Sequence, residues 1–300
     1  MKNCIFIGTC QVFALASILK NVKTFSNEYD IKKIIQVHSY SIEEMDNLIK
    51  NIQEIDLIIC QPISQTYRKG LFSTHRLLES IDKNKTKIVM LPFAYFDGYF
   101  PSICYLKDEM GNKIEKNKIS YHDNNILKHL MERIDIDKSG LDSYLYLTHD
   151  ENFHLNRITN ILNEKEYYNK SICERNVIES LKKLEFREKF PYDYNKSVDI
   201  KISDFIKDNF RKIRLFHTMN HPTNYLLYEL TKRILTFLEL DYSNFNFEMK
   251  EILNDSDFHI YPSIIKNLNL NFNSQLSINK YLSLYFKDIK VSTLLFNYLS

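Results

Sequence analysis

NCIFIGTCQVFALASILK, residues 3–20, decides the fold, because two apolar runs meet there at a polar turn. The first run, residues 3–7, is short and continuously apolar, which is typical of a buried strand. After the turn Gly8-Thr9-Cys10-Gln11, apolar side chains recur at positions 12, 15, 16 and 19, which is the spacing of an amphipathic helix. The stretch therefore predicts a strand, a turn and a helix over residues 11–21.

An export signal is the alternative interpretation of this segment. Lys2 supplies a minimal basic region, and Ala14-Leu15-Ala16 resembles a cleavage site. The polar turn, however, interrupts the apolar run at its centre, where a signal peptide would be continuous. We therefore expect the segment, with Cys10 in it, to be kept as part of a folded core.

Further apolar strands alternate with helical patterns along the first third of the chain. This alternation predicts a parallel α/β sheet flanked by helices on both faces, a flavodoxin-like three-layer arrangement. Residues 213–216 read as a last strand of the same sheet. The other expected strands cover residues 31–37, 56–60 and 87–91, and the expected helices cover residues 42–52, 73–82 and 199–210.

The rest of the chain predicts additions to one domain spanning residues 1–300. From 123 to about 190 the pattern is helical and highly charged, which indicates a helical insert. Residues from about 245 to 300 form a C-terminal extension with short apolar pieces. Residues 93–122, rich in aromatic and turn residues, predict an ordered loop.

Composition excludes several classes of protein. Hydrophobic residues make up 44% of the chain and the net charge is +2, so neither disorder nor general attraction to nucleic acid or an anionic membrane is expected. Five cysteines without a CxxC pair favour reduced thiols in the cytoplasm. With five glycines there is no GxGxxG site, and neither a metal-ligand cluster nor a membrane span is expected.

Cys10 is a candidate nucleophile because it lies where a strand ends and a helix begins. The N–H groups of a helix N-terminus favour a thiolate and can bind an oxyanion. Gly8 allows the chain to turn sharply beneath it. The alternative is a small buried cysteine with no chemical role, and position alone favours that alternative.

His221 is a candidate base that follows the expected strand 213–216. It precedes Pro222, which suits the first turn of a helix, and a helix N-terminus favours a neutral imidazole. Cys10 and His221, from opposite ends of the chain, would both lie at carboxyl ends of strands. Simple capping of the local backbone by His217 and His221 is an equally good reading.

Four further residues are candidates for binding. Gln61, at the end of the strand 56–60, is expected to donate to an oxyanion or substrate, and its alternative role is a local cap. Arg68 is expected to hold a phosphate or carboxylate, with Lys69 beside it, although most surface arginines are simply solvated. Tyr95 lies in the aromatic loop.

Taken together, these motifs resemble the WcbI family of acetyltransferases in bacterial polysaccharide biosynthesis. The family has GNCQ after its first strand, and here the motif is Gly8-Thr9-Cys10-Gln11. The resemblance covers roughly residues 1–270. Its other blocks are DLIICQPI (56–63), YRKGLFSTHRLL (67–78), LPFAYFDGYFP (91–101), YHDNNIL (121–127), ISDFIKDNFRKIRLFHTMNHPTNYLL (202–227) and IYPSI (260–264).

The resemblance implies a cytoplasmic enzyme that binds coenzyme A and has an SGNH-like architecture with Cys10 in the nucleophile's place. Thr9 stands where the family has Asn, so an oxyanion or substrate contact made by that Asn would have a shorter reach here. His217 and Asn220 lie in the matching block 202–227 and are expected to bind coenzyme A or the substrate. Gln11 is expected to lie beside the oxyanion.

We therefore expect O-acetyl transfer from acetyl-CoA to a sugar hydroxyl of a surface glycan or its precursor. Either Cys10 carries the acetyl group, or His221 activates the hydroxyl for direct attack and Cys10 only shapes the pocket. An SGNH-like esterase or deacetylase and a non-catalytic component binding coenzyme A or glycan are the alternatives. A homo-oligomer is left open.

Overall fold

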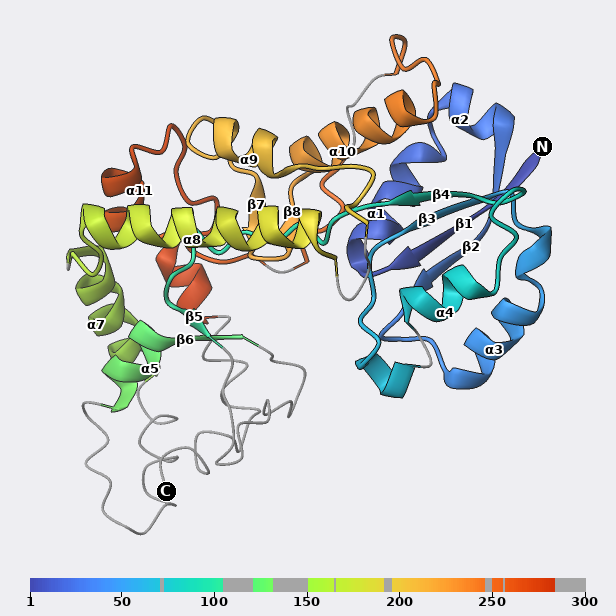
Figure 1. The fold of residues 1–300 in the computed structure, drawn as a ribbon. Helices are drawn as coiled ribbons and strands as arrows, with labels where there is room; N and C mark the ends of the chain where they lie inside the picture. The colour runs from blue at the N-terminus through green and yellow to red at the C-terminus, as the bar shows by residue number, and fades with distance from the viewer. Residues whose placement is uncertain are drawn as a thin grey trace. The chain divides into compact units, whose positions relative to one another are not determined.

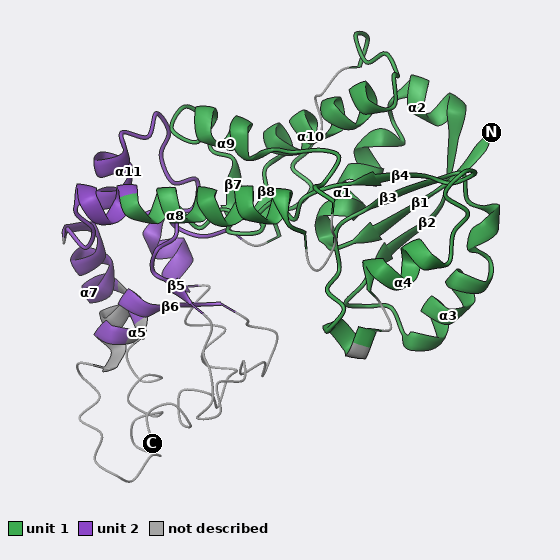
Figure 2. Ribbon diagram, viewed as in Figure 1, with its two compact units in different colours: residues 1–98, 175–256 green, residues 99–174, 257–300 purple. Residues whose placement is uncertain are grey.

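The computed structural model describes residues 1–70, 73–104, 121–131, 151–164, 166–191, 196–245, 250–255 and 257–283. The chain forms two compact units (Figure 2): residues 1–98 with 175–256, and residues 99–174 with 257–300. The predicted division into one domain with an insert and an extension stays a prediction. Within the described residues, no helix is both long enough and apolar enough to cross a bilayer.

The first unit is built on a four-stranded parallel sheet with the order β2-β1-β3-β4 (Figure 1), as the alternating pattern predicted. Each strand is short and mostly apolar, and all neighbours pair in parallel. Their carboxyl ends therefore share one edge of the sheet. The strands are β1 (Lys2–Gly8), β2 (Tyr29–Gln36), β3 (Leu57–Cys60) and β4 (Lys87–Met90).

Helices cover both faces of this sheet, which gives the predicted three-layer arrangement. Because side chains alternate along a strand, Ile5 and Ile7 of β1 pack in one apolar cluster with α3 and α4. Phe6 points to the opposite face and contacts Phe25 of α2. These helices are α1 (Cys10–Leu19), α2 (Lys23–Glu28), α3 (Ile42–Lys50), α4 (Thr74–Glu79) and α10 (Asn224–Phe237), with 3₁₀ turns η1 (Ile52–Glu54) and η2 (Tyr67–Gly70).

The prediction that residues 213–216 form a last strand of the main sheet is wrong. Phe216–Thr218 forms β7, which pairs antiparallel with β8 (His221–Pro222) in a separate two-stranded sheet. Part of the apolar run does form a strand. The chain then turns back at Met219 and Asn220, so this strand pairs with β8 and not with a strand of the main sheet.

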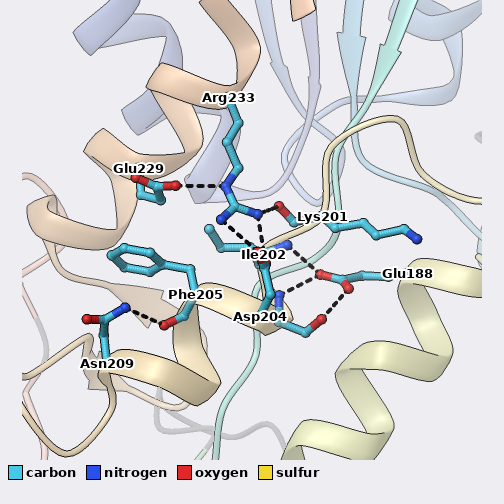
Figure 3. Close-up of polar contacts among 9 residues, drawn as sticks. Glu188, Lys201, Ile202, Asp204, Phe205, Asn209, Glu229 and Arg233 are labelled. Carbon is cyan, nitrogen blue, oxygen red and sulfur yellow. Dashed lines mark hydrogen bonds and ion pairs between the residues drawn. The ribbon is translucent and has the colours of Figure 1, made fainter. Parts of the chain in front are cut away.

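Charged side chains join three helices, of which one begins before the first unit resumes at Arg175 and two lie wholly within it (Figure 3). These helices are α8 (Lys170–Lys189), α9 (Ser203–Asn209) and α10. Glu188 of α8 is buried and accepts hydrogen bonds from Ile202 N at 2.7 Å, from Ser203 N at 2.9 Å and from the Ser203 hydroxyl. It therefore caps α9, whose own N-cap residue, Ile202, has no side-chain acceptor.

Arg233 of α10 makes the second of these connections. Its two Nη atoms donate to the two carboxylate oxygens of Asp204 in α9 at 2.7 and 3.0 Å, and its Nε donates to Glu229 at 2.8 Å. A bidentate pair of this kind fixes the orientation of both side chains. The hydrogen bonds with Arg233 hold the pKa of Asp204 below its usual value.

The second unit contains a two-stranded antiparallel sheet and three helices among its described residues. At its centre, the buried Asp123 accepts hydrogen bonds from Tyr261 at 2.9 Å, from Ser102 at 3.0 Å and from the backbone N–H of Asn125 at 2.9 Å. Burial raises the pKa of this carboxyl, and these donors oppose the shift. The elements are β5 (Ile103–Cys104), β6 (His122–Asp123), α5 (Asn124–Met131), α7 (Glu151–Glu164) and α11 (Pro262–Leu268).

Much of the predicted loop over residues 93–122, and part of the predicted helical insert, lie outside the described residues.

Candidate active site

The candidate site lies at the carboxyl edge of the main sheet, where the segments that follow β1, β3 and β4 meet. Hydrogen bonds of the ladder continue one residue beyond the strands, from Gln61 N to Ile7 O at 2.9 Å and from Leu91 N to Cys60 O at 2.8 Å. The turn after β1 and the segments after β3 and β4 are therefore held side by side.

The side chain of Gln61 fastens this edge. Its Oε1 accepts from both the backbone N and the hydroxyl of Thr9, each at 2.9 Å. Its Nε2 donates to Gln11 Oε1 at 2.9 Å and to the carbonyl of Pro92 at 3.2 Å. All the donors and both lone-pair directions of this buried amide are thus engaged within the protein. Gln61 therefore positions this edge of the sheet, and its expected role as a donor to an oxyanion or substrate stays a prediction.

The side chain of Gln11 extends the same network to the other end of the sequence. Besides Gln61, its Oε1 accepts from Ala94 N at 3.1 Å. Its Nε2 donates to the carbonyl of Ala94 at 2.7 Å and to that of Asn220 at 2.8 Å. Gln11 therefore joins the first turn of α1 to the loop after β4 and to the β7–β8 hairpin.

Gly8 is required at this edge by close packing. A Cβ atom on Gly8 would lie 2.6 Å from Gln61 Oε1 and 2.8 Å from Val12 Cγ1, both inside van der Waals contact. Gly8 thus permits a close approach of the Gln61 amide, in addition to its expected role where the chain turns from β1 into α1.

Thr9 is the N-cap residue of α1. Its hydroxyl oxygen accepts from Gln11 N at 3.4 Å while donating to Gln61. The hydroxyl is thus bonded on both its donor and its acceptor side. Thr9 therefore stabilises the turn between β1 and α1 through these two hydrogen bonds. Its contact with an oxyanion or substrate stays a prediction.

Cys10 is the first residue of α1 and is partly exposed. Burial raises the pKa of its thiol, although the Thr9 side chain and the backbone N–H groups of Cys10 and Gln11 act in the opposite direction. The donors at the helix N-terminus thus act as expected, but burial outweighs them in the pKa of this thiol, and the role of Cys10 as a nucleophile stays a prediction.

His221 lies on the hairpin beside Asn220. The prediction that Pro222 begins a helix is wrong: both residues form β8, Thr223 is the N-cap residue, and α10 begins at Asn224. Burial lowers the pKa of His221, the nearby His217 lowers it further, and Asp255 opposes the shift. The imidazole is thus kept neutral mainly by burial. Its Nδ1 is buried and has no hydrogen-bond partner among the described residues.

His217 and Asn220 support the hairpin. His217 is buried, and its Nε2 lies 3.0 Å from Oε2 of Glu251, which also accepts from Asn224 N at 2.9 Å. Asn220 accepts from the Thr218 hydroxyl with its side chain and from Gln11 with its carbonyl. Direct contact of His217 or Asn220 with a substrate stays a prediction.

The predicted cationic residues lie on the η2 turn. Arg68 has a φ of 45° and donates through its Nη atoms to the carbonyls of His38, at 3.0 Å, and Tyr40. An anion bound by Arg68 would have to share these donors. The side chain of Lys69 lies outside the described residues, so the predicted binding roles of both residues stay predictions.

Tyr95 and its surroundings follow β4. The guanidinium of Arg187, on α8, lies 5.3 Å from the centre of the Tyr95 ring, and Phe93 stacks on the same ring. Such a cation–π contact holds the loop against α8. Arg187 was not predicted, since nothing in the sequence links residues 92 positions apart.

Other features lie apart from this edge. His75 is exposed and pairs with Glu79 in its own helix at 3.2 Å. A hollow of about 670 Å³ beside α9 and α10 contains none of the predicted site residues among the eight that line it. Among the described residues, no group of three or more His, Cys, Asp and Glu side chains is arranged to hold a metal ion.

Glu251, Asp255 and Ala94 contact or influence the predicted residues and were not among them. No motif in the sequence marks Glu251 or Asp255 as part of the site. Ala94 contacts Gln11 through its backbone, so the identity of its side chain could not indicate this role. The side-chain network of Gln11 and Gln61 could have been inferred, since both amides lie at strand ends of one parallel sheet.

The chain is similar to a solved structure and matches a protein family. A solved structure of WcbI, described as a novel polysaccharide biosynthesis enzyme, is similar to this chain with a TM-score of 0.74 and 24% sequence identity, over 97% of this chain and 89% of that one. At this identity the likeness shows the fold. No curated protein matches the chain. The family described as polysaccharide biosynthesis enzyme WcbI matches residues 3–139 and 142–243. The chain therefore belongs to the WcbI family of polysaccharide biosynthesis enzymes.

Proposed function

We propose that this protein is a coenzyme A-dependent O-acetyltransferase that transfers an acetyl group from acetyl-CoA to a sugar hydroxyl during the synthesis of capsular or other surface polysaccharide. The observation that carries the proposal is the hydrogen bond of 2.8 Å between Gln11 Nε2 and Asn220 O. Cys10 precedes Gln11 and His221 follows Asn220, so this bond brings a thiol and a neutral imidazole to the same edge of the sheet.

Coenzyme A is proposed as co-substrate because of this fold. The solved WcbI structure is described as the native protein without a disulfide bond between coenzyme A and a cysteine of that protein. In the present chain, Cys10 is partly exposed at the first turn of α1, where the N–H groups of Gln11 and Val12 donate to Thr9 at 3.4 and 3.1 Å and that of Cys10 is the first of the helix. A thioester carbonyl placed beside Cys10 would be close to these donors.

For the chemical step, His221 is proposed as the general base. Burial lowers its pKa, so it is neutral at physiological pH, and Nδ1 is not committed to another described residue. It would accept the proton of the sugar hydroxyl as that oxygen attacks the thioester carbonyl, and the coenzyme A thiolate would leave. The backbone N–H of Cys10 is proposed to stabilise the developing oxyanion.

Cys10 is proposed to line the pocket in this direct reaction. Burial raises the pKa of its thiol, which opposes the thiolate that a covalent route needs at rest. A covalent route would require His221 to take the thiol proton as sulfur attacks, with acetyl-Cys10 then passing the group to the sugar.

The test uses the purified full chain, radiolabelled acetyl-CoA and de-O-acetylated surface polysaccharide from cells that carry the gene. Saturable binding of coenzyme A, together with transfer of label to polysaccharide that is lost in His221→Ala, is the expected result. No binding of coenzyme A would overturn the proposal. Release of acetate from acetylated polysaccharide without coenzyme A would instead identify an esterase, and binding without transfer would identify a non-catalytic component.

A further inference from the structure

The segment after β4, residues 93–97, is extended and is bonded along one edge. Both the N–H and the carbonyl of Ala94 bond to the Gln11 side chain, and Phe96 N donates to Met219 O at 2.8 Å. Ala94 and Phe96 are buried, and the side chains of an extended segment alternate between two faces. The opposite face is only partly buried and carries the side chains of Phe93, Tyr95 and Asp97.

Helix α8 packs along this segment. The Ser180 hydroxyl accepts from Asp97 N at 3.0 Å, and Asn176 Nδ2 donates to Asp97 O at 2.8 Å. The Arg187 guanidinium lies 5.3 Å from the centre of the Tyr95 ring. Seven residues make nearly two helical turns, so Ser180 and Arg187 lie on the same side of α8, about 10 Å apart along its axis. Asp97 and Arg187 therefore lie at the two ends of one row of side chains.

The carboxylate of Asp97 is not satisfied within the protein. Its Oδ1 is buried and has no hydrogen-bond partner in the described structure, and the hydrogen bonds of this residue involve its backbone. The buried carboxylates of Asp123 and Glu188, by contrast, each accept at least three hydrogen bonds. A buried carboxylate oxygen without a donor costs stability, so we expect its donor to be supplied by a ligand.

Arg187 carries the opposite charge and is also uncommitted. It is half-buried, and it makes no hydrogen bond or ion pair with any residue that the structure describes. Arg76 and Arg233 each pair instead with a carboxylate at 2.7 Å. A guanidinium that lies over a ring still directs N–H donors outward, and this planar fork binds a carboxylate or phosphate through two parallel hydrogen bonds.

Four side chains thus form what we call the acceptor cluster: Phe93, Tyr95, Asp97 and Arg187. We propose that this cluster binds the sugar chain that receives the acetyl group, and that this chain is acidic. Asp97 accepts hydrogen bonds from sugar hydroxyls, the exposed parts of the two rings contact the apolar face of a sugar, and Arg187 binds a carboxylate or phosphate of the chain.

This inference rests on the proposed function, because it names the acceptor of the same reaction. The backbone of Ala94 joins the cluster to Gln11, the neighbour of Cys10, so a bound sugar chain lies beside the candidate site. The phosphates of coenzyme A suit the cluster less well, since the unpaired carboxylate of Asp97 would repel them.

The experiment measures binding of de-O-acetylated surface polysaccharide, from cells that carry the gene, to the full chain by isothermal titration without coenzyme A. The polysaccharide is cut to oligosaccharides of matched length and compared with carboxyl-reduced and with phosphate-free preparations. We expect at least tenfold weaker binding of one of these. Loss on carboxyl reduction identifies a sugar carboxylate as the ligand of Arg187, and loss on removal of phosphate identifies a sugar phosphate. Equal binding of all three preparations overturns the proposal.

Two variants test the cluster itself. Asp97→Asn should weaken oligosaccharide binding at least tenfold and leave the urea midpoint of unfolding unchanged or higher, because its carboxylate has no donor to lose. Arg187→Lys keeps a cation over the Tyr95 ring but loses the planar fork, and should weaken binding at least fivefold. In both variants the KM for polysaccharide should rise, while the Kd of coenzyme A should change less than twofold.

Matched control variants make the same changes elsewhere in the first unit. Asp208→Asn alters an exposed carboxylate on α9, and Arg211→Lys alters a guanidinium 4.6 Å from the centre of the Phe210 ring. Both should bind oligosaccharide like the wild type. The proposal is overturned if the cluster variants also bind like the wild type, if Asp97→Asn lowers the urea midpoint, or if Arg187→Lys weakens the binding of coenzyme A instead. Oligosaccharide binding without any acetyl transfer would overturn the proposed function alone.

Discussion

Gln11 donates a hydrogen bond of 2.8 Å to the carbonyl of Asn220, which lies 209 positions later in the chain. The same amide bonds to Gln61, and through it to the turn at Thr9. Two buried side-chain amides thus connect four segments of the sheet edge. Because a buried amide is costly to leave unpaired, each segment fixes the position of the others.

Gln61→Leu is expected to lower the free energy of unfolding by about 2–4 kcal/mol. It removes the oxygen that accepts from both the N–H and the hydroxyl of Thr9 and leaves the Gln11 amide partly unpaired, at about 1–3 kcal/mol for each buried group that loses its partner. Urea unfolding followed by circular dichroism measures this. The matched control is Gln53→Leu, whose amide makes an exposed hydrogen bond to Ser80 O, and it should cost less than about 0.5 kcal/mol. Equal losses in the two variants would contradict the network.

His221→Ala is expected to lower kcat/KM for acetyl transfer by at least about 100-fold, the usual contribution of a general base. Because the pKa of His221 is below its ordinary value of 6.5, the base stays neutral into mildly acidic solution. Activity should therefore fall only as the pH drops through a midpoint below 6.5. His75→Ala, an exposed histidine paired in its own helix, is the control and should retain wild-type activity.

His217→Asn tests the origin of that midpoint. The charge of His217 contributes to lowering the pKa of His221, so its removal should move the acid limb of the pH–rate profile to higher pH. An unchanged midpoint with lower activity at every pH would instead indicate that His217 only supports the hairpin through Glu251.

Cys10→Ala is expected to retain transfer activity within about tenfold of the wild type, because the direct reaction uses the thiol as a wall of the pocket. Intact-mass measurements after incubation with acetyl-CoA alone should show no acetyl adduct. An adduct mapped to Cys10, with activity abolished in both Cys10→Ala and Cys10→Ser, would establish the covalent route in its place. Cys173→Ala provides the thiol control.

The strand–turn–helix at residues 2–19 and the four strands of a parallel sheet could be predicted because their apolar patterns are local, whereas the order of the strands was not predicted. Membership of the WcbI family was likewise predicted, from several motifs in series, and is confirmed. The β7–β8 hairpin could not be predicted, since an apolar run does not reveal which strand it will pair with.

The causes of the pKa shifts of Cys10 and His221 could not be predicted from the sequence either. Position at a helix N-terminus suggested a thiolate at Cys10, but burial dominates its pKa, and burial depends on packing by distant segments. The same holds for His221, whose neutral state was predicted for a helix terminus and arises mainly from loss of solvent.

Glu188→Ala is expected to lower the free energy of unfolding by about 3 kcal/mol. It removes the only side-chain cap of α9 and leaves two buried N–H groups and the Ser203 hydroxyl without their acceptor in the described structure. Glu188→Gln keeps one oxygen that can accept from the two N–H groups, but it loses the charge and replaces the oxygen that accepts from the Ser203 hydroxyl with an NH2 group, so it should cost roughly half as much. Urea unfolding of both variants measures the difference.

Glu185→Ala is the matched control, one turn earlier on the exposed side of the same helix. It removes a carboxylate of equal charge and helix propensity, so its cost should stay within about 0.5 kcal/mol. If Glu185→Ala and Glu188→Ala were equally destabilising, the loss would come from α8 itself. A loss confined to Glu188 instead assigns it to the cap on α9, and a double variant with Ser203→Ala should then cost less than the sum of the two single changes, because both remove the same hydrogen bond.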